Sequence, residues 1–344
     1  MGEINLEKPL VSIIIPVYNM GDMLENSVKS AAAQTYDNIE ILLIDDGSKD
    51  DSLKVCESIA QRDSRVKVFH QENKGSGPAR NLGIEKASGK YVYFFDADDA
   101  MEENAVEILV KNLETESCDM VVFGYRMLHP DGREEVYNAY PGKVFGGEYV
   151  RSHYDIFLNR AKMYIQGAPW NKMFSLEKIK EHGIKYPALR RNQDEVFIMM
   201  YVDVADRILL IDDVLYNHYP NDIHGAFKKF PLDFFDIVSS VNEYRYKYMY
   251  GWNEENKRVL EIICSDFLNG TNKSMMLLFN PKWELSFKER YSKIKDIARR
   301  CVEEMPDKNY NTDSTLYSLM KRKRYVLLYF AAYLAIFKNK KYIR

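Results

Sequence analysis

The sequence predicts an α/β fold with a parallel sheet, followed by a helix-rich C-terminal region. Short β-branched apolar runs alternate with segments of helical apolar spacing over residues 10–125. Such alternation is typical of parallel strands joined by helices. From about residue 231 only helical patterns follow. The 344-residue chain is 46% hydrophobic and 29% charged, which is typical of a globular enzyme of about two domains.

The spacing of apolar residues predicts each element in order. Continuous apolar runs bounded by turns predict strands at 10–17, 39–44, 66–69, 91–95, 119–125, 207–211 and 214–219. Apolar residues three or four positions apart predict helices at 21–34, 52–61, 78–87, 102–114, 147–160, 193–205, 232–249, 254–268, 273–279, 284–304 and 314–337. In such a sheet, ligands bind at the carboxyl ends of the strands.

The net charge of −3 conceals an uneven distribution. Residues 321–344 contain eight basic residues and no acidic one, whereas the rest of the chain contains 40 basic and 51 acidic residues. The acidic body argues against nucleic-acid binding. Residues 325–337 form an uncharged run, shorter than the roughly 20 residues that span a bilayer. Its basic flanks predict contact with an anionic membrane surface, and the alternative is packing inside the protein or between subunits.

The four cysteines lie far apart and form no CxxC pair, and the N-terminal residues show no signal-peptide pattern. Both observations predict a reducing, cytoplasmic environment. With the basic tail, they favour a peripheral position at the inner face of the plasma membrane.

Two groups of carboxylates directly follow predicted buried strands. Asp45 and Asp46 end the run 39–44, although Asp46 could also be only part of a turn that caps a helix. Asp96, Asp98 and Asp99 end the run 91–95. Clustered carboxylates repel one another unless a cation or a donor compensates, and Mg²⁺ and Mn²⁺ prefer oxygen ligands. The alternative for this second group is a solvated acidic turn.

Two further segments contain residues suited to binding or catalysis. The glycine-rich segment 75–83 opens a predicted helix, and its Arg80 could reach a phosphate or pair with the acidic strand ends. It does not match GxGxxG or a P-loop. In the segment 190–197, Asp194 and Glu195 open another helix, where they could complement the helix dipole or supply a general base. A lone histidine at a strand end, His218, is a candidate ligand or a structural residue.

Together, these segments resemble the family 2 inverting glycosyltransferases with the GT-A fold, of the bacterial surface-polysaccharide or teichoic-acid type. The resemblance covers residues 9 to about 225. The matching segments are 11–19 (VSIIIPVYN), 34–36 (QTY), 44–48 (IDDGS), 79–83 (ARNLG), 89–91 (GKY), 96–99 (DADD) and 193–197 (QDEVF). The resemblance implies a Rossmann-like mixed sheet with helices on both faces, to which the C-terminal helices are an extension.

The resemblance also implies roles in donor binding. Pro16, Tyr18 and Asp46 would hold the nucleoside base, and Asp96 would contact the ribose. Asp98 would bind Mn²⁺ or Mg²⁺ at the donor diphosphate, with Asp99 as a possible second ligand and His218 as a weaker one. Arg80 would contact the donor.

The resemblance implies that residues in the second half of the domain carry out catalysis and bind the acceptor. Asp194 would be the catalytic base, although the family often has Glu-Asp where this chain has Gln193-Asp194. A smaller group would contact the acceptor or the diphosphate: Trp170, Lys172, Arg191 and Glu195.

The predicted activity is transfer of a sugar from a nucleotide-diphosphate sugar, with UDP favoured, to a saccharide, polyol-phosphate or lipid-linked acceptor. Residues 1–126 would bind the nucleotide sugar, 127–230 the acceptor, and 231–344 would form the helical region, which could also pair subunits in a homo-oligomer. A nucleotidyltransferase of similar fold and an inactive, transferase-like scaffold are the alternatives.

Overall fold

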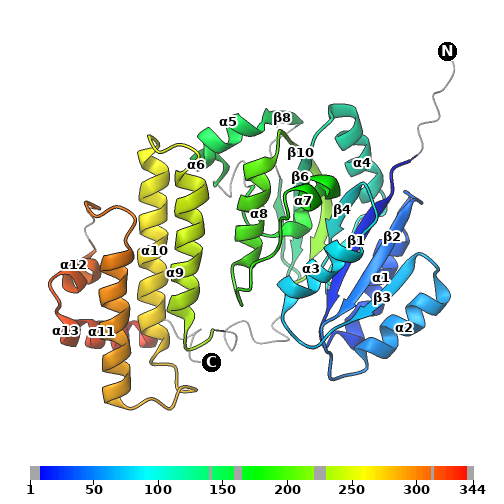
Figure 1. The fold of residues 1–344 in the computed structure, drawn as a ribbon. Helices are drawn as coiled ribbons and strands as arrows, with labels where there is room; N and C mark the ends of the chain where they lie inside the picture. The colour runs from blue at the N-terminus through cyan, green and yellow to red at the C-terminus, as the bar shows by residue number, and fades with distance from the viewer. Residues whose placement is uncertain (1–7, 139–141, 159–164, 221–229, 311–313, 339–344) are drawn as a thin grey trace. The chain divides into compact units, whose positions relative to one another are not determined.

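The computed structural model describes residues 8–138, 142–158, 165–220, 230–310 and 314–338. The chain divides into two compact units, residues 1–220 and 221–344 (Figure 1). Among the described helices, none is both long enough and apolar enough to cross a bilayer.

The first unit is a ten-stranded mixed sheet with the order β3-β2-β1-β4-β9-β6-β10-β5, in which β7 pairs with β6 and β8 with β10. The strands are β1 (Val11–Val17), β2 (Ile39–Asp45), β3 (Val66–His70), β4 (Tyr91–Phe94), β5 (Ala100–Met101), β6 (Met120–Leu128), β7 (Glu134–Tyr137), β8 (Lys143–Gly146), β9 (Lys172–Ser175) and β10 (Arg207–His218). β1, β2, β3 and β4 are parallel, whereas β9 runs antiparallel to both β4 and β6.

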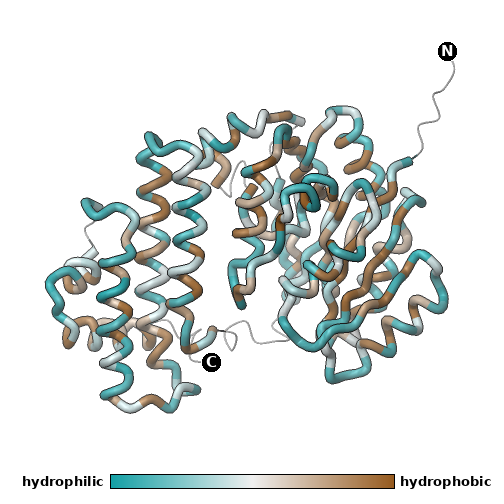
Figure 2. The backbone as a smooth tube through the Cα atoms, in the orientation of Figure 1, coloured by the Kyte–Doolittle hydropathy of each residue, from teal (hydrophilic) through white to brown (hydrophobic). Residues whose placement is uncertain are grey.

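Helices cover both faces of this sheet (Figure 1). The side chains of Ile13 and Ile15 share a core with α1 (Gly21–Ala32), α2 (Ser52–Arg62) and α4 (Ala105–Glu116). The intervening Ile14 faces the other side, where α3 (Ser76–Lys86) packs so closely that a Cβ on Gly83 would lie 2.4 Å from the Ile14 side chain. The central strands β1 and β2 are mostly apolar because both of their faces are buried (Figure 2). Their polar residues, Ser12, Glu40 and Asp45, are also buried.

The remaining short elements of this unit are α5 (Gly147–Ser152), α6 (Tyr154–Phe157), the 3₁₀ turn Pro169–Asn171 and α7 (Leu176–Glu181). The longer α8 (Gln193–Val204) begins at Asn192, which has a left-handed backbone with φ of 59°. Phe197 on α8 packs edge-on against Phe94 of β4 and Phe174 of β9.

The sheet corrects several sequence predictions. The alternation of strands and helices alone predicts a parallel sheet, whereas the sheet is mixed, as the family resemblance implies, because β9 enters between β4 and β6 in the opposite direction. The short strands β5, β7, β8 and β9 were missed, since two to four residues do not establish an alternating pattern. The two strands predicted at 207–211 and 214–219 are one strand, β10, interrupted by a register shift between Leu210 and Tyr216.

The second unit is helical. It contains α9 (Phe234–Arg245), a π-helical turn (Tyr246–Tyr250), α10 (Lys257–Leu277), α11 (Phe287–Glu304), α12 (Thr315–Lys321) and α13 (Tyr325–Lys338). Ser286 and Glu289 form a capping box at the start of α11. Helices α10 to α13 share one hydrophobic core.

Helix boundaries in both units also differ from the prediction. The segments 254–268 and 273–279 are a single helix, α10, and the segment 314–337 is two helices, because Lys323 takes a left-handed conformation with φ of 54° between them. The predicted helix 147–160 is divided into α5 and α6, and its last two positions lie outside the described residues.

Candidate active site

The carboxyl ends of β2, β1 and β4 lie side by side at one edge of the sheet. β1 pairs in parallel with β2 on one side, where Val17 aligns with Asp45, and with β4 on the other, where Ile14 aligns with Phe94. This arrangement places Pro16 and Tyr18, Asp45 and Asp46, and the segment 96–99 at the same edge. Parallel α/β sheets bind their ligands at this edge.

The carboxylate of Asp46 is held by the segment that leads into α3. Its Oδ1 accepts hydrogen bonds from Gln71 Nε2 at 2.7 Å and from the Lys74 backbone N–H at 2.9 Å. Its Oδ2 accepts one from the Gly75 N–H at 2.8 Å. The neighbouring Gly47 has φ of 69°, and a Cβ there would lie 2.7 Å from the Asn73 nitrogen. A turn that only glycine fits therefore fixes Asp46 in a buried position.

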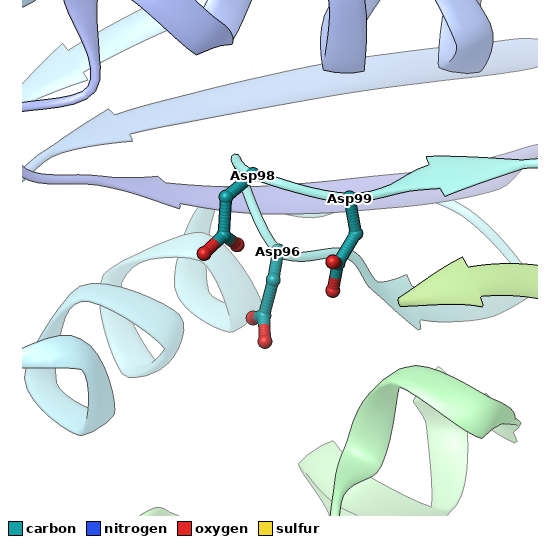
Figure 3. A group of neighbouring side chains, drawn as sticks. All are labelled: Asp96, Asp98 and Asp99. Atoms are coloured by element: carbon teal, nitrogen blue, oxygen red, sulfur yellow. The ribbon is translucent and has the colours of Figure 1, made fainter. Parts of the chain in front are cut away.

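The carboxylates of Asp96, Asp98 and Asp99 point to the same side of the loop after β4 (Figure 3). Their oxygens lie within 4.8 Å of one another, and among the described residues no other His, Cys, Asp or Glu belongs to a group of this kind. Three carboxylates at this spacing match the oxygen ligands that Mg²⁺ and Mn²⁺ prefer.

Asp99 is the buried member of this group. Its carboxylate accepts hydrogen bonds from the Tyr216 hydroxyl at 2.6 Å and the Tyr219 backbone N–H at 2.8 Å, and His218 Nδ1 lies 3.1 Å from both of its oxygens. Burial raises the pKa of Asp99, and His218 partly opposes this shift. Burial lowers the pKa of His218, but Asp99 more than offsets that effect and raises it overall. His218 therefore contacts the carboxylate group through Asp99.

Arg80 joins this strand edge to the start of α8. Its Nη2 donates to Asp96 Oδ1 at 2.8 Å and its Nη1 donates to Asp194 Oδ1 at 3.0 Å. The side chain of Arg80 is only 5% exposed. Burial alone would lower the pKa of this guanidinium, but Asp194 and Asp96 raise it. Of the two alternatives from the sequence, the structure shows Arg80 pairing with carboxylates.

Asp194 and the neighbouring Glu195 have different surroundings. Both lie in the first turn of α8, where the helix dipole favours negative charge. The side chain of Asp194 is 36% exposed and contacts Arg80, whereas Glu195 is buried and its Oε2 accepts from Asn192 Nδ2 at 3.4 Å. Desolvation raises the pKa of Asp194, and Asp96 adds to the shift, whereas Arg80 and Lys172 oppose it. Asp194 is therefore the acid that belongs to the carboxylate network.

Lys172, the first residue of β9, is fully buried. Its Nζ donates to the Ala168 carbonyl at 2.8 Å and to Asn171 Oδ1 at 2.7 Å. Desolvation lowers the pKa of Lys172 to about 7, although Asp194 acts in the opposite direction. Arg191 lies half-buried just before α8.

Trp170 contacts two of the residues that hold Asp99. Its ring stacks on Tyr216 at 4.6 Å and on His218 at 5.3 Å between centroids. It also contacts Tyr125 edge-on at 4.7 Å. Trp170 forms part of the wall of a cavity of about 320 Å³, whose other walls include Tyr125, Tyr137 and Asn171. None of the three carboxylates lines this cavity, and Trp170 connects it to them through Tyr216 and His218, which contact Asp99.

Comparison with known proteins identifies the family. The model of glycosyl transferase family 2 matches residues 12–166. Glycosyltransferase GlyG of Streptococcus pneumoniae serotype 4 is 33% identical over 215 residues, which are 60% of this chain and 69% of GlyG. The chain belongs to glycosyl transferase family 2.

Solved structures show that this glycosyltransferase has the GT-A fold. TarS 1–349 of S. aureus, crystallised with UDP-GlcNAc, superposes with a TM-score of 0.66 at 20% identity, covering 97% of this chain and 93% of TarS 1–349. The mannosyltransferase PcManGT of Pyrobaculum calidifontis, in complex with GDP-Man and Mn²⁺, superposes with a TM-score of 0.53 at 14% identity, covering 95% and 87% of the two chains. The predicted mixed α/β fold with a helical C-terminal extension is confirmed.

Several residues that build the site of this glycosyltransferase were not found from the sequence. Tyr216 contacts Asp99 from a position 117 residues away, and Tyr186 lies with its ring 5.5 Å from the Arg80 guanidinium. Gln71 contacts Asp46 from the end of β3. Tyr216 shares one face of a strand with His218, and this spacing of two is the one local signal that could have indicated it.

Proposed function

We propose that this glycosyltransferase moves a sugar from a UDP-linked donor to a hydroxyl of a cell-surface polysaccharide, teichoic-acid or lipid-linked acceptor, with inversion at the anomeric carbon. One observation carries the proposal. Arg80 contacts Asp96 and Asp194 at once, so a strand-end carboxylate group and the first turn of α8 belong to one site. The TarS structure that holds UDP-GlcNAc supports a UDP-linked donor.

In this proposal the donor lies along the edge formed by β2, β1 and β4. Asp46 accepts a base N–H, and Pro16 and Tyr18 enclose the base. Asp96 contacts the ribose, and its second contact, Arg80, keeps it from turning away. The buried setting of Asp46 makes its hydrogen bonds directional and strong, because water does not compete for the carboxylate.

Asp98 would hold Mn²⁺ or Mg²⁺ beside the donor diphosphate, next to the Asp96 that contacts the ribose. Asp99 lies within 4.8 Å of these carboxylates, and its oxygens are held in place by Tyr216, His218 and Tyr219. The ion would neutralise the charge that develops on the departing diphosphate. The PcManGT complex with Mn²⁺ supports this choice of ion.

Asp194 takes the proton from the acceptor hydroxyl as that oxygen attacks the anomeric carbon. A raised pKa suits this role, because the carboxylate binds the proton more tightly. Arg80 orients the carboxylate through Oδ1. Lys172 and Arg191 add positive charge near Asp194, and Glu195 anchors the helix start. The cavity beside Trp170 receives the acceptor saccharide, whose ring would pack against the aromatic walls.

We place this reaction in the cytoplasm. The four cysteines are free and buried, which suits a reducing compartment.

The test compares Asp194→Asn with Asp203→Asn, a change of an exposed carboxylate near the end of the same helix. Purified chain is given UDP-GlcNAc and other UDP-, GDP- and CDP-sugars with Mn²⁺. Acceptors are chromogenic glycosides, ribitol-phosphate oligomers and polyprenyl-linked saccharides. Asp194→Asn lowers kcat by about 10²–10⁴-fold, because a positioned base contributes that much, while UDP binding by calorimetry is unchanged.

Asp203→Asn retains the activity of the unmodified chain. NMR of the product shows the inverted anomer, and chelation of the metal abolishes transfer. Normal turnover by Asp194→Asn rejects Asp194 as the base, retention of configuration rejects the single displacement, and full activity in excess chelator rejects the metal.

A further inference from the structure

The C-terminal helix α13 has two different apolar faces. Leu328, Ala332 and Ile336 are buried and belong to the core that α13 shares with α10, α11 and α12. On the other side, six large apolar residues are each 43–58% exposed: Val326, Leu327, Phe330, Tyr333, Leu334 and Phe337. Their spacing of three, four and seven residues places them on one continuous stripe. We refer to this stripe as the apolar face of α13.

The apolar face of α13 extends onto α11. Phe287, the first residue of α11, is 62% exposed, the most exposed large apolar side chain in the described chain. Its ring lies 4.8 Å from that of Tyr329, which in turn contacts Phe330. Contiguous exposed apolar surface of this kind marks an interaction site rather than scattered single residues.

Positive charge borders this face at both ends. Lys321, Arg322, Lys323 and Arg324 precede α13 and are all exposed, and the exposed Lys338 ends it. The sequence continues with Lys340, Lys341 and Arg344, and residues 321–344 contain no acidic residue.

This distribution of charge distinguishes between two partners that could cover the apolar face, a second copy of the chain and a lipid surface. A second copy seated on the same face would bring basic ends together whether the two helices ran parallel or antiparallel, because both ends are positive. Like charges at an interface oppose association. An anionic lipid surface can bury the apolar face at the boundary of the acyl chains, and its negative headgroups attract the basic residues at both ends of the helix.

We propose that the apolar face of α13 lies in the headgroup region of an anionic membrane, parallel to its surface. At about 1.5 Å per residue, the 14 residues of α13 extend for about 21 Å along that surface. The lysine and arginine side chains before α13, and Lys338 at its end, reach the phosphates while their aliphatic stems follow the apolar surface. The tyrosine at position 333 has the ring and hydroxyl typical of the interface. Figure 2 shows the hydropathy of α13 along the backbone.

The experiment measures co-sedimentation of the full chain with vesicles. One set contains phosphatidylglycerol with phosphatidylcholine, and the other contains phosphatidylcholine alone. A face variant carries Leu327→Ser, Phe330→Ser and Leu334→Ser, and a charge variant carries Arg322→Gln, Lys323→Gln and Arg324→Gln. Val136→Ser is the matched control for the face, because Val136 is 53% exposed in the first unit. Lys247→Gln with Lys257→Gln is the control for charge, because both lysines are exposed in the second unit outside α11 and α13.

We expect the unmodified chain to bind the anionic vesicles, and both α13 variants to lose at least about tenfold in partition coefficient. Both controls retain binding. Circular dichroism shows the same helix content in all variants, and hydrolysis of UDP-GlcNAc in solution is unchanged, so a failure here is distinct from a failure of the catalytic proposal.

Three results would overturn the proposal: no binding to anionic vesicles, equal binding to uncharged vesicles, or a dimer in sedimentation velocity that the face variant dissociates. The last result would assign the face to a second copy of the chain. If the face variant loses helix content, the charge variant, which leaves the apolar packing intact, decides alone.

Discussion

The two units of the chain treat charge and apolar surface in opposite ways. Among the described residues, every buried charged side chain lies in the first unit: Glu40, Asp45, Asp46, Arg80, Asp99, Lys172 and Glu195. In the described part of the second unit, every buried polar side chain is neutral, and most of the exposed large apolar residues lie there. Buried charge and exposed apolar surface both cost free energy, so each indicates a function.

The two units therefore have different roles: the first contains the candidate active site, and the second carries the apolar face proposed to bind a membrane. In the first unit, desolvation shifts the pKa values of Asp99, Lys172 and Asp194, as is typical of reaction sites. In the second unit, a helix that would be buried in most proteins leaves one face exposed. A substitution therefore has different consequences according to the unit in which it is made.

The largest effect is expected when the buried guanidinium is removed. Arg80→Leu leaves the Asp96 and Asp194 carboxylates without the buried cation that joins them. Because the two carboxylates are 28% and 36% exposed, solvent screens them, and we expect a cost of about 2 kcal/mol of unfolding free energy, less than for a fully buried pair. Transfer activity is lost as well. Urea denaturation measures the stability, and hydrogen exchange of the β4 and α8 amides reports the first unit separately.

Phe330→Ser is the corresponding test in the second unit, because it replaces an exposed apolar side chain instead of a buried charged one. Phe330 is 54% exposed, so the change alters the free energy of unfolding by no more than about 0.5 kcal/mol. If Phe330→Ser costs as much as Arg80→Leu, the contrast between the two units is wrong.

The sequence predicted those features of the two units that depend on local patterns of residues. The runs 10–17 and 39–44 predicted β1 and β2 because both faces of these strands are buried. The carboxylates that follow the runs 39–44 and 91–95 were placed at the ligand-binding edge. The tail was identified because charge and apolar character are local properties of the sequence.

Partners distant in the chain could not be predicted. Arg80 and Asp194 are 114 residues apart, and no local pattern distinguishes their contact from a phosphate contact. β9 lies between β4 and β6 although it follows both in sequence, and its four residues are too few for a periodic signal. Two apolar faces on α13 also look alike in the sequence, and only packing against α10 and α11 distinguishes the buried one.

An intermediate effect is expected in the pH dependence of transfer. Asp194 must be ionised to accept a proton, and desolvation raises its pKa. Activity is therefore present at high pH and falls as the pH drops through this raised pKa, so the acid limb of kcat/KM lies above the ordinary aspartate value of about 3.9. Lys172, with its pKa lowered to about 7, is charged on the acid side of neutrality and favours ionised Asp194.

Lys172→Met removes that favourable charge and moves the acid limb to still higher pH, whereas Asp203→Asn leaves it in place. The measurement is kcat/KM for UDP-GlcNAc across the acid range. An acid limb at the ordinary value, or one that Lys172→Met does not move, would contradict the coupling between these buried charges.

The smallest effect is expected at the aromatic wall of the cavity. Trp170→Phe keeps an aromatic ring against Tyr216 and His218 but reduces the surface offered to the acceptor. Ring contacts of this kind are worth about 0.5–1.5 kcal/mol, so the acceptor KM rises by about 2–12-fold. Hydrolysis of UDP-GlcNAc by water, which needs no acceptor sugar, stays within about twofold by the same reasoning.

Trp252→Phe, the same change in the second unit, alters neither rate. The split between transfer and hydrolysis is the decisive measurement, because a general loss of folding lowers both. If Trp170→Phe lowers both rates equally while its free energy of unfolding is unchanged, then Trp170 supports His218 and Asp99 rather than the acceptor.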